Sequence, residues 1–84
     1  MKIVFDDAVW NDYVYWQKTD RKVVLRINTL IKDICGSPFE GIGKPERLKH
    51  ALSGFWSRRI DEVHRVVYTV EGDELRIAQL RYHY

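Results

Sequence analysis

Apolar residues in the first half of the chain recur at intervals of three and four, which is the period of an amphipathic helix. Aspartates stand before both apolar stretches and can cap helices there, while Gly36 precedes Ser37-Pro38 and can end the second helix. The pattern predicts a short strand at 2–5, a helix from a cap at Asp6 or Asp7 to about Thr19 with Val9, Tyr13 and Trp16 on one side, and a helix from a cap at Asp20 to Gly36 with Val24, Ile27, Ile31 and Ile34 on one side.

The second half alternates apolar and polar residues with the period of two that is typical of strands. Residues 39–45 contain glycine and proline and predict a loop that leads to Glu46. Polar loops at 61–63 and 71–73 indicate an antiparallel meander. The predicted strands are a short extended piece near Glu46–Leu48, then Phe55–Ile60, His64–Val70 and Leu75–Tyr82. The expected fold class is α+β, with an N-terminal strand and a two-helix hairpin packed on a small, mainly antiparallel sheet.

Strand parity divides the side chains of this sheet between two faces. Regular three-residue loops imply the pairs Ile60–His64, Arg59–Arg65, Val70–Glu74 and Arg65–Gln79. One face is expected to stay open and to hold Ser57, Arg59, Arg65, Thr69, Gln79, Arg81 and His83. The other is expected to pack on the helices and to hold Trp56, Ile60, a structural His64, Val66, Tyr68, Val70, Ala78, Leu80 and Tyr82.

Composition limits the chain to a small globular protein. Its 84 residues predict one domain, 1–84, that folds alone or as a small oligomer such as a homodimer. No apolar run approaches the ~20 residues of a membrane span, and the lone Cys35, expected to be a small buried or helix-end residue, fits a reducing, cytoplasmic setting. Residues 43–84 carry eight Lys/Arg and six Asp/Glu, which is the whole net charge of +2. Such a small excess predicts local phosphate contacts that need help from a larger partner.

Ionisable residues gather in this second half in three clusters, which are Glu46 with Lys49, Arg59 with Arg65, and Arg81-Tyr82-His83-Tyr84. They supply a base, an acid and fixed positive charge, which are the groups needed to cleave RNA through its own 2′-hydroxyl. At neutral pH a carboxylate is the natural proton acceptor and an imidazole the natural donor. Neither the histidines nor the single cysteine have the spacing of a zinc site, so we expect no metal and no cofactor.

Several longer motifs give a more specific indication. They are the run Pro38–Glu46, Leu48-Lys49, the run Leu52–Ile60, His64-Arg65, Val67-Tyr68 and the ending Arg81–Tyr84. In these motifs the chain closely resembles the YoeB toxins of the RelE/ParE superfamily, and the resemblance spans essentially the whole sequence. One departure is Val63, since a glutamate often precedes the His-Arg pair in that family. This puts any auxiliary role of that carboxylate in doubt.

The resemblance implies a type II toxin–antitoxin endoribonuclease that binds the ribosomal A site and cuts the mRNA codon there. It implies a small α+β fold, no metal, and a cognate YefM-like antitoxin, the ribosome and mRNA as partners. By the same resemblance, Glu46 matches the general base, His83 the general acid and Arg65 the stabiliser of the transition state. The residues that match phosphate-binding or substrate-orienting positions are Lys49, Arg59 and Tyr84.

Two other classes of function remain open from the sequence. The first is a non-catalytic inhibitor that uses the same small fold to bind its target, as ParE toxins do with DNA gyrase. Glu46 and the His83-Tyr84 ending argue against it, because a pure binder needs neither. The second is a plain RNA-binding module that stacks bases on exposed aromatic side chains.

Overall fold

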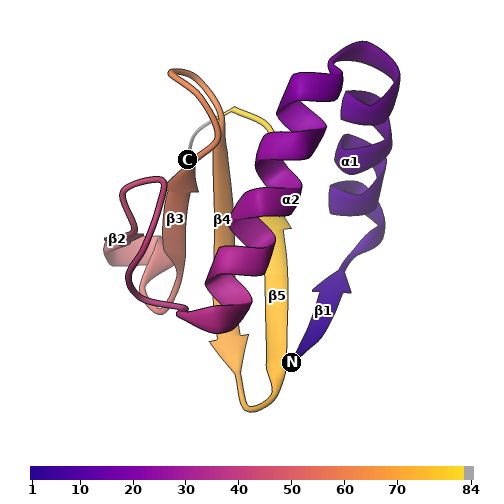
Figure 1. The fold of residues 1–84 in the computed structure, drawn as a ribbon. Helices are drawn as coiled ribbons and strands as arrows, with labels where there is room; N and C mark the ends of the chain where they lie inside the picture. Colours follow the sequence, from indigo (N-terminus) through magenta and orange to yellow (C-terminus); the bar gives the residue numbers. More distant parts are fainter. Residues whose placement is uncertain (83–84) are drawn as a thin grey trace.

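Two helices cover one face of a five-stranded sheet in the computed structural model, which describes residues 1–82 (Figure 1). The strand order is β1-β5-β4-β3-β2, with β1 parallel to β5 and the other neighbours antiparallel. The elements are β1 (Lys2–Phe5), α1 (Asp7–Thr19), α2 (Arg21–Gly36), β2 (Glu46–Arg47), a 3₁₀ turn (His50–Leu52), β3 (Trp56–Arg59), β4 (Arg65–Glu71) and β5 (Glu74–Gln79). The predicted α+β class and the predicted helical hairpin are confirmed.

Aspartate caps begin both helices, as predicted. The Asp6 carboxylate accepts a hydrogen bond from the Val9 amide at 3.0 Å, which satisfies a backbone donor that the first turn leaves free. Asp20 caps α2 through its side chain and ends α1 through its backbone amide, which donates to the carbonyl of Trp16 at 2.9 Å. This single residue turns the chain between the helices, so α1 and α2 form a tight antiparallel pair.

The core lies between the helices and the sheet. The predicted apolar stripes supply Val9 and Trp16 from α1 and Ile27, Ile31 and Ile34 from α2, all buried, while Tyr13 and Val24 are partly buried against the same core. Trp16 also donates its indole N–H to the carbonyl of Leu80 at 2.9 Å. This bond joins α1 to the chain just after β5, so the first helix helps to fix the C-terminal segment.

The register of the first hairpin is confirmed, but that of the second is wrong. Arg59 pairs with Arg65 as expected. Glu71 pairs with Glu74, so the second loop has two residues, and Gly72 takes a positive φ of 59° that suits such a turn. A β-bulge between Val67 and Tyr68 shifts the register again, and Val67 rather than Arg65 lies opposite Gln79.

These shifts change which β5 side chains face the helices. The two-residue turn places Leu75 and Ile77 in the core and leaves Ala78 exposed, whereas Ala78 was expected on the packed face. Leu80 returns to the core as predicted, because the bulge restores the original parity. The strand ends at Gln79, and Tyr82, expected in the core, is 57% exposed with φ at 60°.

The prediction that Arg81 lies on the open face of the sheet is also wrong. Its guanidinium carbon lies 3.7 Å from the ring centroid of Tyr15, and Nη1 is 4.0 Å from the carboxylate of Asp12, so the side chain packs against α1 rather than on the open sheet face. Cation–π attraction and the early end of β5 account for this placement.

Candidate active site

Three of the predicted site residues share the face of the sheet that points away from the helices. Glu46 on the edge strand β2 pairs with Ser57 on β3, and Arg59 follows two positions later on the same face of β3. Arg65 lies opposite Arg59 on β4. Diagonal cross-strand neighbours such as Glu46 and Arg59 are typically about 7–8 Å apart, within reach of long side chains. Glu46, Arg59 and Arg65 therefore project from one face of the sheet, on which Ser57, expected to be open, is buried.

The arginine pair is poorly neutralised. The ion pairs among residues 1–82 include neither Arg59 nor Arg65. The Nη1 of Arg65 donates to the carbonyls of Asp61 at 2.9 Å and His64 at 3.1 Å, which fixes this half-buried side chain, while Arg59 is exposed. Two adjacent cations with free donor capacity suit an anion that accepts several hydrogen bonds, such as a phosphodiester.

The turn between β3 and β4 orients Arg65. The Asp61 carboxylate accepts from the amides of Val63 at 2.8 Å and His64 at 2.7 Å. Partial burial works to raise the pKa of Asp61, but these amide hydrogen bonds and the nearby positive charges outweigh it, so the pKa is lowered. Val63 is exposed in this turn. The ionised carboxylate holds the turn whose carbonyl groups receive the Arg65 guanidinium.

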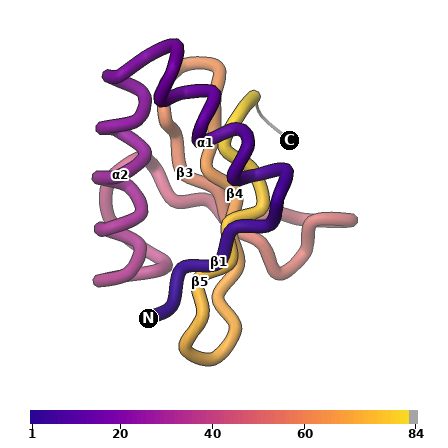
Figure 2. The backbone as a smooth tube through the Cα atoms, turned by 90° about the vertical axis from the view of Figure 1, so that its right-hand side faces the viewer, coloured from indigo at the N-terminus to yellow at the C-terminus, as the bar shows by residue number. Residues whose placement is uncertain are grey.

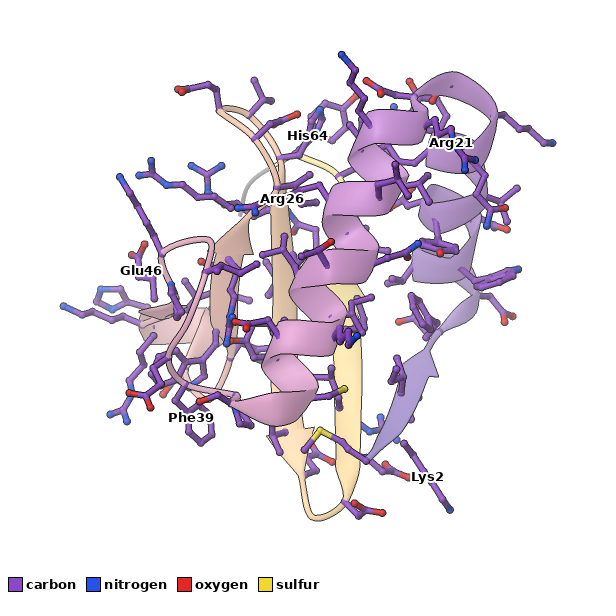
Figure 3. All side chains as sticks on the ribbon, viewed as in Figure 1. Lys2, Arg21, Arg26, Phe39, Glu46 and His64 are labelled. Carbon is purple, nitrogen blue, oxygen red and sulfur yellow. The ribbon has the colours of Figure 1, made fainter. Side chains whose placement is uncertain are left out.

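Lys49 joins Glu46 at a shallow cavity of about 320 Å³ beside β2. It is exposed and stands at the start of the 3₁₀ turn, in a segment that projects from the sheet away from α2 (Figure 2). His50 lines the same cavity with a left-handed φ of 59°. Nothing in the sequence spacing indicates that His50 lies at the same cavity as Glu46. Figure 3 shows Glu46 at the edge of the sheet that β2 forms.

The predicted acid His83 and the predicted Tyr84 lie outside the described residues. The chain that leads to them is well tied to β4, because the Arg65 amide donates to the carbonyl of Tyr82 at 2.8 Å. The Tyr82 amide donates to Nδ1 of His64 at 2.6 Å. His64 also packs edge-on against Trp16, with ring centroids 4.8 Å apart, so the prediction of a structural histidine is confirmed.

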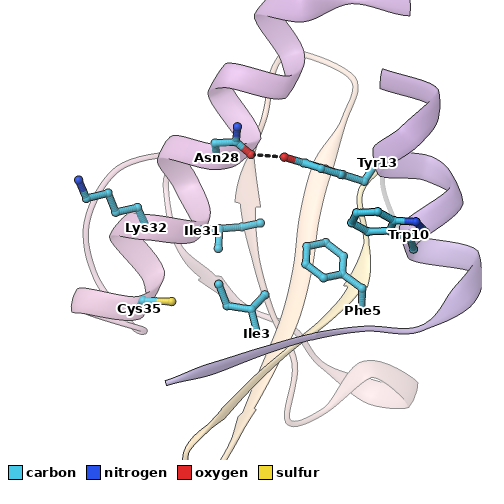
Figure 4. Close-up of a pocket in the computed structure, with 8 residues that line it drawn as sticks. All are labelled: Ile3, Phe5, Trp10, Tyr13, Asn28, Ile31, Lys32 and Cys35. Atoms are coloured by element: carbon cyan, nitrogen blue, oxygen red, sulfur yellow. Dashed lines mark hydrogen bonds between the residues drawn. The ribbon is translucent and has the colours of Figure 1, made fainter. Parts of the chain in front are cut away.

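A larger cavity of about 560 Å³ lies at the other edge of the sheet, between β1, α1 and α2 (Figure 4). Its walls are mainly apolar and include Phe5 and Trp10, and the Tyr13 hydroxyl donates to Asn28 at 2.7 Å across it. Cys35 is partly buried there in the last turn of α2, as expected for a small helix-end residue. This cavity has no carboxylate or imidazole in its lining and therefore lacks an acid–base pair.

Comparison with known proteins decides the family. The model of the YoeB-like toxins of bacterial type II toxin–antitoxin systems matches residues 5–84. The chain belongs to this family. It is 61% identical to the YoeB toxin of Escherichia coli strain K12 over 84 residues, with both chains covered completely. As a member of the YoeB-like toxins it is the toxin component of a type II system, in a family of endoribonuclease toxins.

Solved YoeB structures have the same fold. A YoeB/ParE toxin from Agrobacterium tumefaciens is 48% identical and superposes with a TM-score of 0.97, with both chains covered completely. The Staphylococcus aureus YoeB is 47% identical over 100% of this chain and 98% of that chain, and it has been solved in a heterotetrameric YoeB–YefM complex, with a TM-score of 0.92, and as a dimer, with a TM-score of 0.93. The likeness covers the strands that carry Glu46, Arg59 and Arg65.

Two further observations concern the described residues of this YoeB-like toxin. Within residues 1–82 no three histidine, cysteine or acidic side chains come together as a possible metal site. Neither α1 nor α2 has the length and apolar character needed to cross a membrane.

Proposed function

We propose that this YoeB-like toxin is a metal-independent endoribonuclease that cuts mRNA in the ribosomal A site by attack of the RNA's own 2′-hydroxyl. The observation that carries the proposal is the placement of the Glu46 carboxylate beside the Arg59–Arg65 pair on one open sheet face. Phosphodiester cleavage of this kind needs a proton acceptor and fixed positive charge around the phosphate. A face built only for binding has no use for a carboxylate among phosphate-binding cations.

Each residue has a distinct part in the proposed reaction. Glu46 takes the proton of the 2′-hydroxyl, and the 2′-oxygen attacks the adjacent phosphorus while the bond to the 5′-oxygen breaks. Arg65 stabilises the charge that develops on the non-bridging oxygens, and His83 gives a proton to the departing 5′-oxygen. Arg59, Lys49 and Tyr84 bind phosphate or orient the substrate. The products are a 2′,3′-cyclic phosphate and a free 5′-hydroxyl.

The proposed partners follow from the reaction and from the relatives. In this proposal the ribosome presents the message, which compensates for the weak attraction to RNA expected from a net charge of only +2. Action on ribosomes implies that the toxin works in the cytoplasm. A YefM-like antitoxin is the proposed inhibitor, because the S. aureus toxin forms a complex with YefM. The basic open face suits an acidic-apolar antitoxin segment that covers or rearranges the site. We also propose a homodimer of the free toxin, since the S. aureus toxin has been solved as a dimer.

The test is to incubate programmed ribosomes with the purified toxin and to map new mRNA ends. We expect cuts within the A-site codon for the unaltered protein and greatly reduced cutting for Glu46→Gln. Glu71→Gln is a matched control, since Glu71 is an exposed carboxylate on β4 that pairs with Arg76 at 3.7 Å, and this variant should cut normally. Inhibition of translation without new mRNA ends would instead favour a non-catalytic inhibitor. Binding to RNA with neither effect would favour a plain RNA-binding module.

A further inference from the structure

Glu46 stands on a strand that holds its position poorly by itself. β2 has only two residues, paired as Glu46 with Ser57 and Arg47 with Trp56, and it forms the edge of the sheet. So short an edge strand frays unless other contacts support it. The chain reaches β2 through a loop, residues 37–45, without regular structure. The position of Glu46 therefore depends on how this loop is fixed.

The loop is held by the guanidinium of Arg58, which is fully buried. Its Nη2 donates to the carbonyls of Ser37 at 2.6 Å and Glu40 at 3.0 Å. Nη1 donates to the carbonyl of Ile42 at 3.2 Å and to the carboxylate of Asp33, and Nε donates to the Tyr68 hydroxyl at 3.2 Å. These contacts use all five donors of an arginine side chain. A guanidinium with three loop carbonyls as acceptors fixes the loop as a unit.

Asp33, in the last turn of α2, completes the arrangement from the helix side. The same carboxylate oxygen that pairs with Arg58 accepts from the Ile42 amide at 3.1 Å. The hydrogen bond from Arg58, followed by that from the Ile42 amide, lowers the pKa of Asp33. A Cβ added at Gly41, whose φ is +131°, would lie 2.1 Å from this oxygen. The loop thus approaches Asp33 so closely that only glycine fits.

Backbone hydrogen bonds connect the loop and the segment after β2 to β3 and the residue before it. The Arg59 amide donates to the carbonyl of Gly43 at 2.7 Å, and the Leu48 amide donates to that of Phe55 at 2.9 Å. Arg26 of α2, labelled in Figure 3, is also involved. Its side chain donates to the carbonyl of Arg59 at 3.2 Å. Arg58 and Arg59 are neighbours on β3, so their side chains point to opposite faces of the sheet. Arg58 fixes the loop on the helix side of the sheet. Arg59 projects from the opposite face, which also carries Glu46.

We propose that Arg58 and Asp33 are positioning residues that fix Glu46 relative to Arg59 and Arg65 by clamping loop 37–45 to α2 and β3. The proposal rests on the function proposed above and adds residues that do not touch the RNA. A displacement of about 1 Å in a catalytic group can lower a rate by ~100-fold. Loosening the clamp should therefore slow the chemical step and leave docking on the ribosome nearly intact.

Asp33→Asn is the informative variant, because the amide keeps the size of the side chain and an oxygen acceptor but loses the charge that Arg58 faces. We expect single-turnover cleavage to fall ~10-fold or more, with ribosome affinity changed by less than about 2-fold. Glu71→Gln removes a carboxylate from an exposed ion pair and serves as the matched control. Equal losses in cleavage and in ribosome binding would overturn the proposal.

A double-mutant cycle separates positioning from general loss of structure. If Asp33 acts through Glu46, then Asp33→Asn should matter little, less than about 2-fold, in a protein that already carries Glu46→Gln. A merely structural role would reduce cleavage by the same factor in both backgrounds, and that result would also overturn the proposal. Residual cleavage by the Glu46→Gln protein is measured at high toxin concentration.

Hydrogen exchange tests the clamp without any cleavage. In Asp33→Asn, the amides of Ile42, Leu48 and Arg59 should exchange faster, while that of Lys2, which bonds to Asp73 at 2.7 Å across the sheet, should not change. Unchanged exchange at all of them would overturn the clamp. If the unaltered toxin fails to cut mRNA, the proposed function fails, but this measurement still reports on the clamp.

Tyr68→Phe is the second variant, in case Asp33→Asn does not fold. It retains the buried ring and removes only the hydroxyl, which donates to the Pro38 carbonyl at 2.6 Å and accepts from Arg58. It should produce the same pattern to a smaller degree, with faster exchange at Ile42 and slower cleavage. A folded variant with wild-type exchange and cleavage would contradict the proposal.

Discussion

Arg59 and Arg65 lie directly opposite each other on β3 and β4, with both side chains on the sheet face that points away from the helices. Like charges in this arrangement destabilise a sheet. The described residues offer no carboxylate within ion-pair distance of either guanidinium. The free toxin therefore holds a like-charged pair. The phosphate that we propose to bind there would relieve this repulsion, so we expect substrate binding and folding stability to be linked at this position.

The repulsion predicts that Arg59→Gln stabilises the free protein. Its backbone bonds to Gly43 and Arg26 remain, and only the charge is lost. We expect the free energy of unfolding to rise by about 0.2–1 kcal/mol at low salt, and the gain to shrink as salt screens the pair. Urea denaturation at two ionic strengths measures this. Arg76→Gln is the control, because Arg76 pairs with Glu71 and Glu74 and its loss should not stabilise. A destabilised Arg59→Gln protein at low salt would show that no such repulsion exists.

The role proposed for Arg65 predicts a loss of rate without a loss of docking. Arg65→Ala removes the donors aimed at the developing charge, and we expect single-turnover cleavage to fall by ~100-fold or more, the usual scale for a lost oxyanion donor. Arg65→Lys should restore only part of the rate, because an ammonium group lacks the planar fork of a guanidinium. Ribosome binding is measured in parallel. Cleavage and binding that fall together would assign Arg65 to docking.

Local patterns in the sequence were enough to predict the helices and the first hairpin. Asp6 and Asp20 cap the helices as expected, because capping depends on residues adjacent in the chain. The Arg59–Arg65 pair was predicted because the intervening loop is regular. The register of the second hairpin was not predicted correctly. Gly72 permits a tighter turn, and a bulge at Val67/Tyr68 then restores the expected assignment of side chains to the two faces. The buried residues Leu75, Ile77 and Leu80 are spaced by two and then by three, so a strictly regular alternation does not describe this segment.

The clamp on loop 37–45 could not be predicted from the sequence for a different reason. Arg58 and Asp33 are 25 positions apart, and an arginine between polar neighbours on a strand gives no sign of burial. Parity alone places Arg58 on the packed face, but a charged residue there requires a partner that only the folded chain reveals. The identities of Glu46, Arg65 and His83 as site residues came from motif resemblance together with their chemistry, and their roles stay predictions.

The clamp also predicts how stability responds to acid. Its hydrogen bonds lower the pKa of Asp33 below the ordinary value of 3.8, so the native state favours the ionised carboxylate. The stabilisation is therefore fully present above the unfolded value and is lost as pH falls through the lowered native pKa. We expect the difference in unfolding free energy between the unaltered protein and Asp33→Asn to be constant near neutral pH and to shrink on acidification below about pH 4. Denaturant titrations across this range measure it, and a difference that grows in acid would contradict the assigned sign.

The last prediction tests the nucleophile. Replacing the single ribose on the 5′ side of the scissile phosphate with deoxyribose removes the only group on which Glu46 is proposed to act, so cleavage should be abolished. The unmodified message should yield an upstream product with a 2′,3′-cyclic phosphate and a downstream product with a free 5′-hydroxyl. Gel mapping and mass analysis of the two ends report both results.

Binding of the deoxy-substituted message must be measured beside cleavage, because a weaker complex would imitate a chemical defect. We expect near-normal occupancy of the A site, since the cations of the open face are proposed to bind phosphate oxygens rather than the 2′-hydroxyl. Persistent cleavage at a comparable rate would mean that water is the nucleophile, and Glu46 would then be activating water instead of RNA. Loss of cleavage with intact binding, and with normal cutting when the deoxy sugar is moved one nucleotide away, supports attack by the RNA's own hydroxyl.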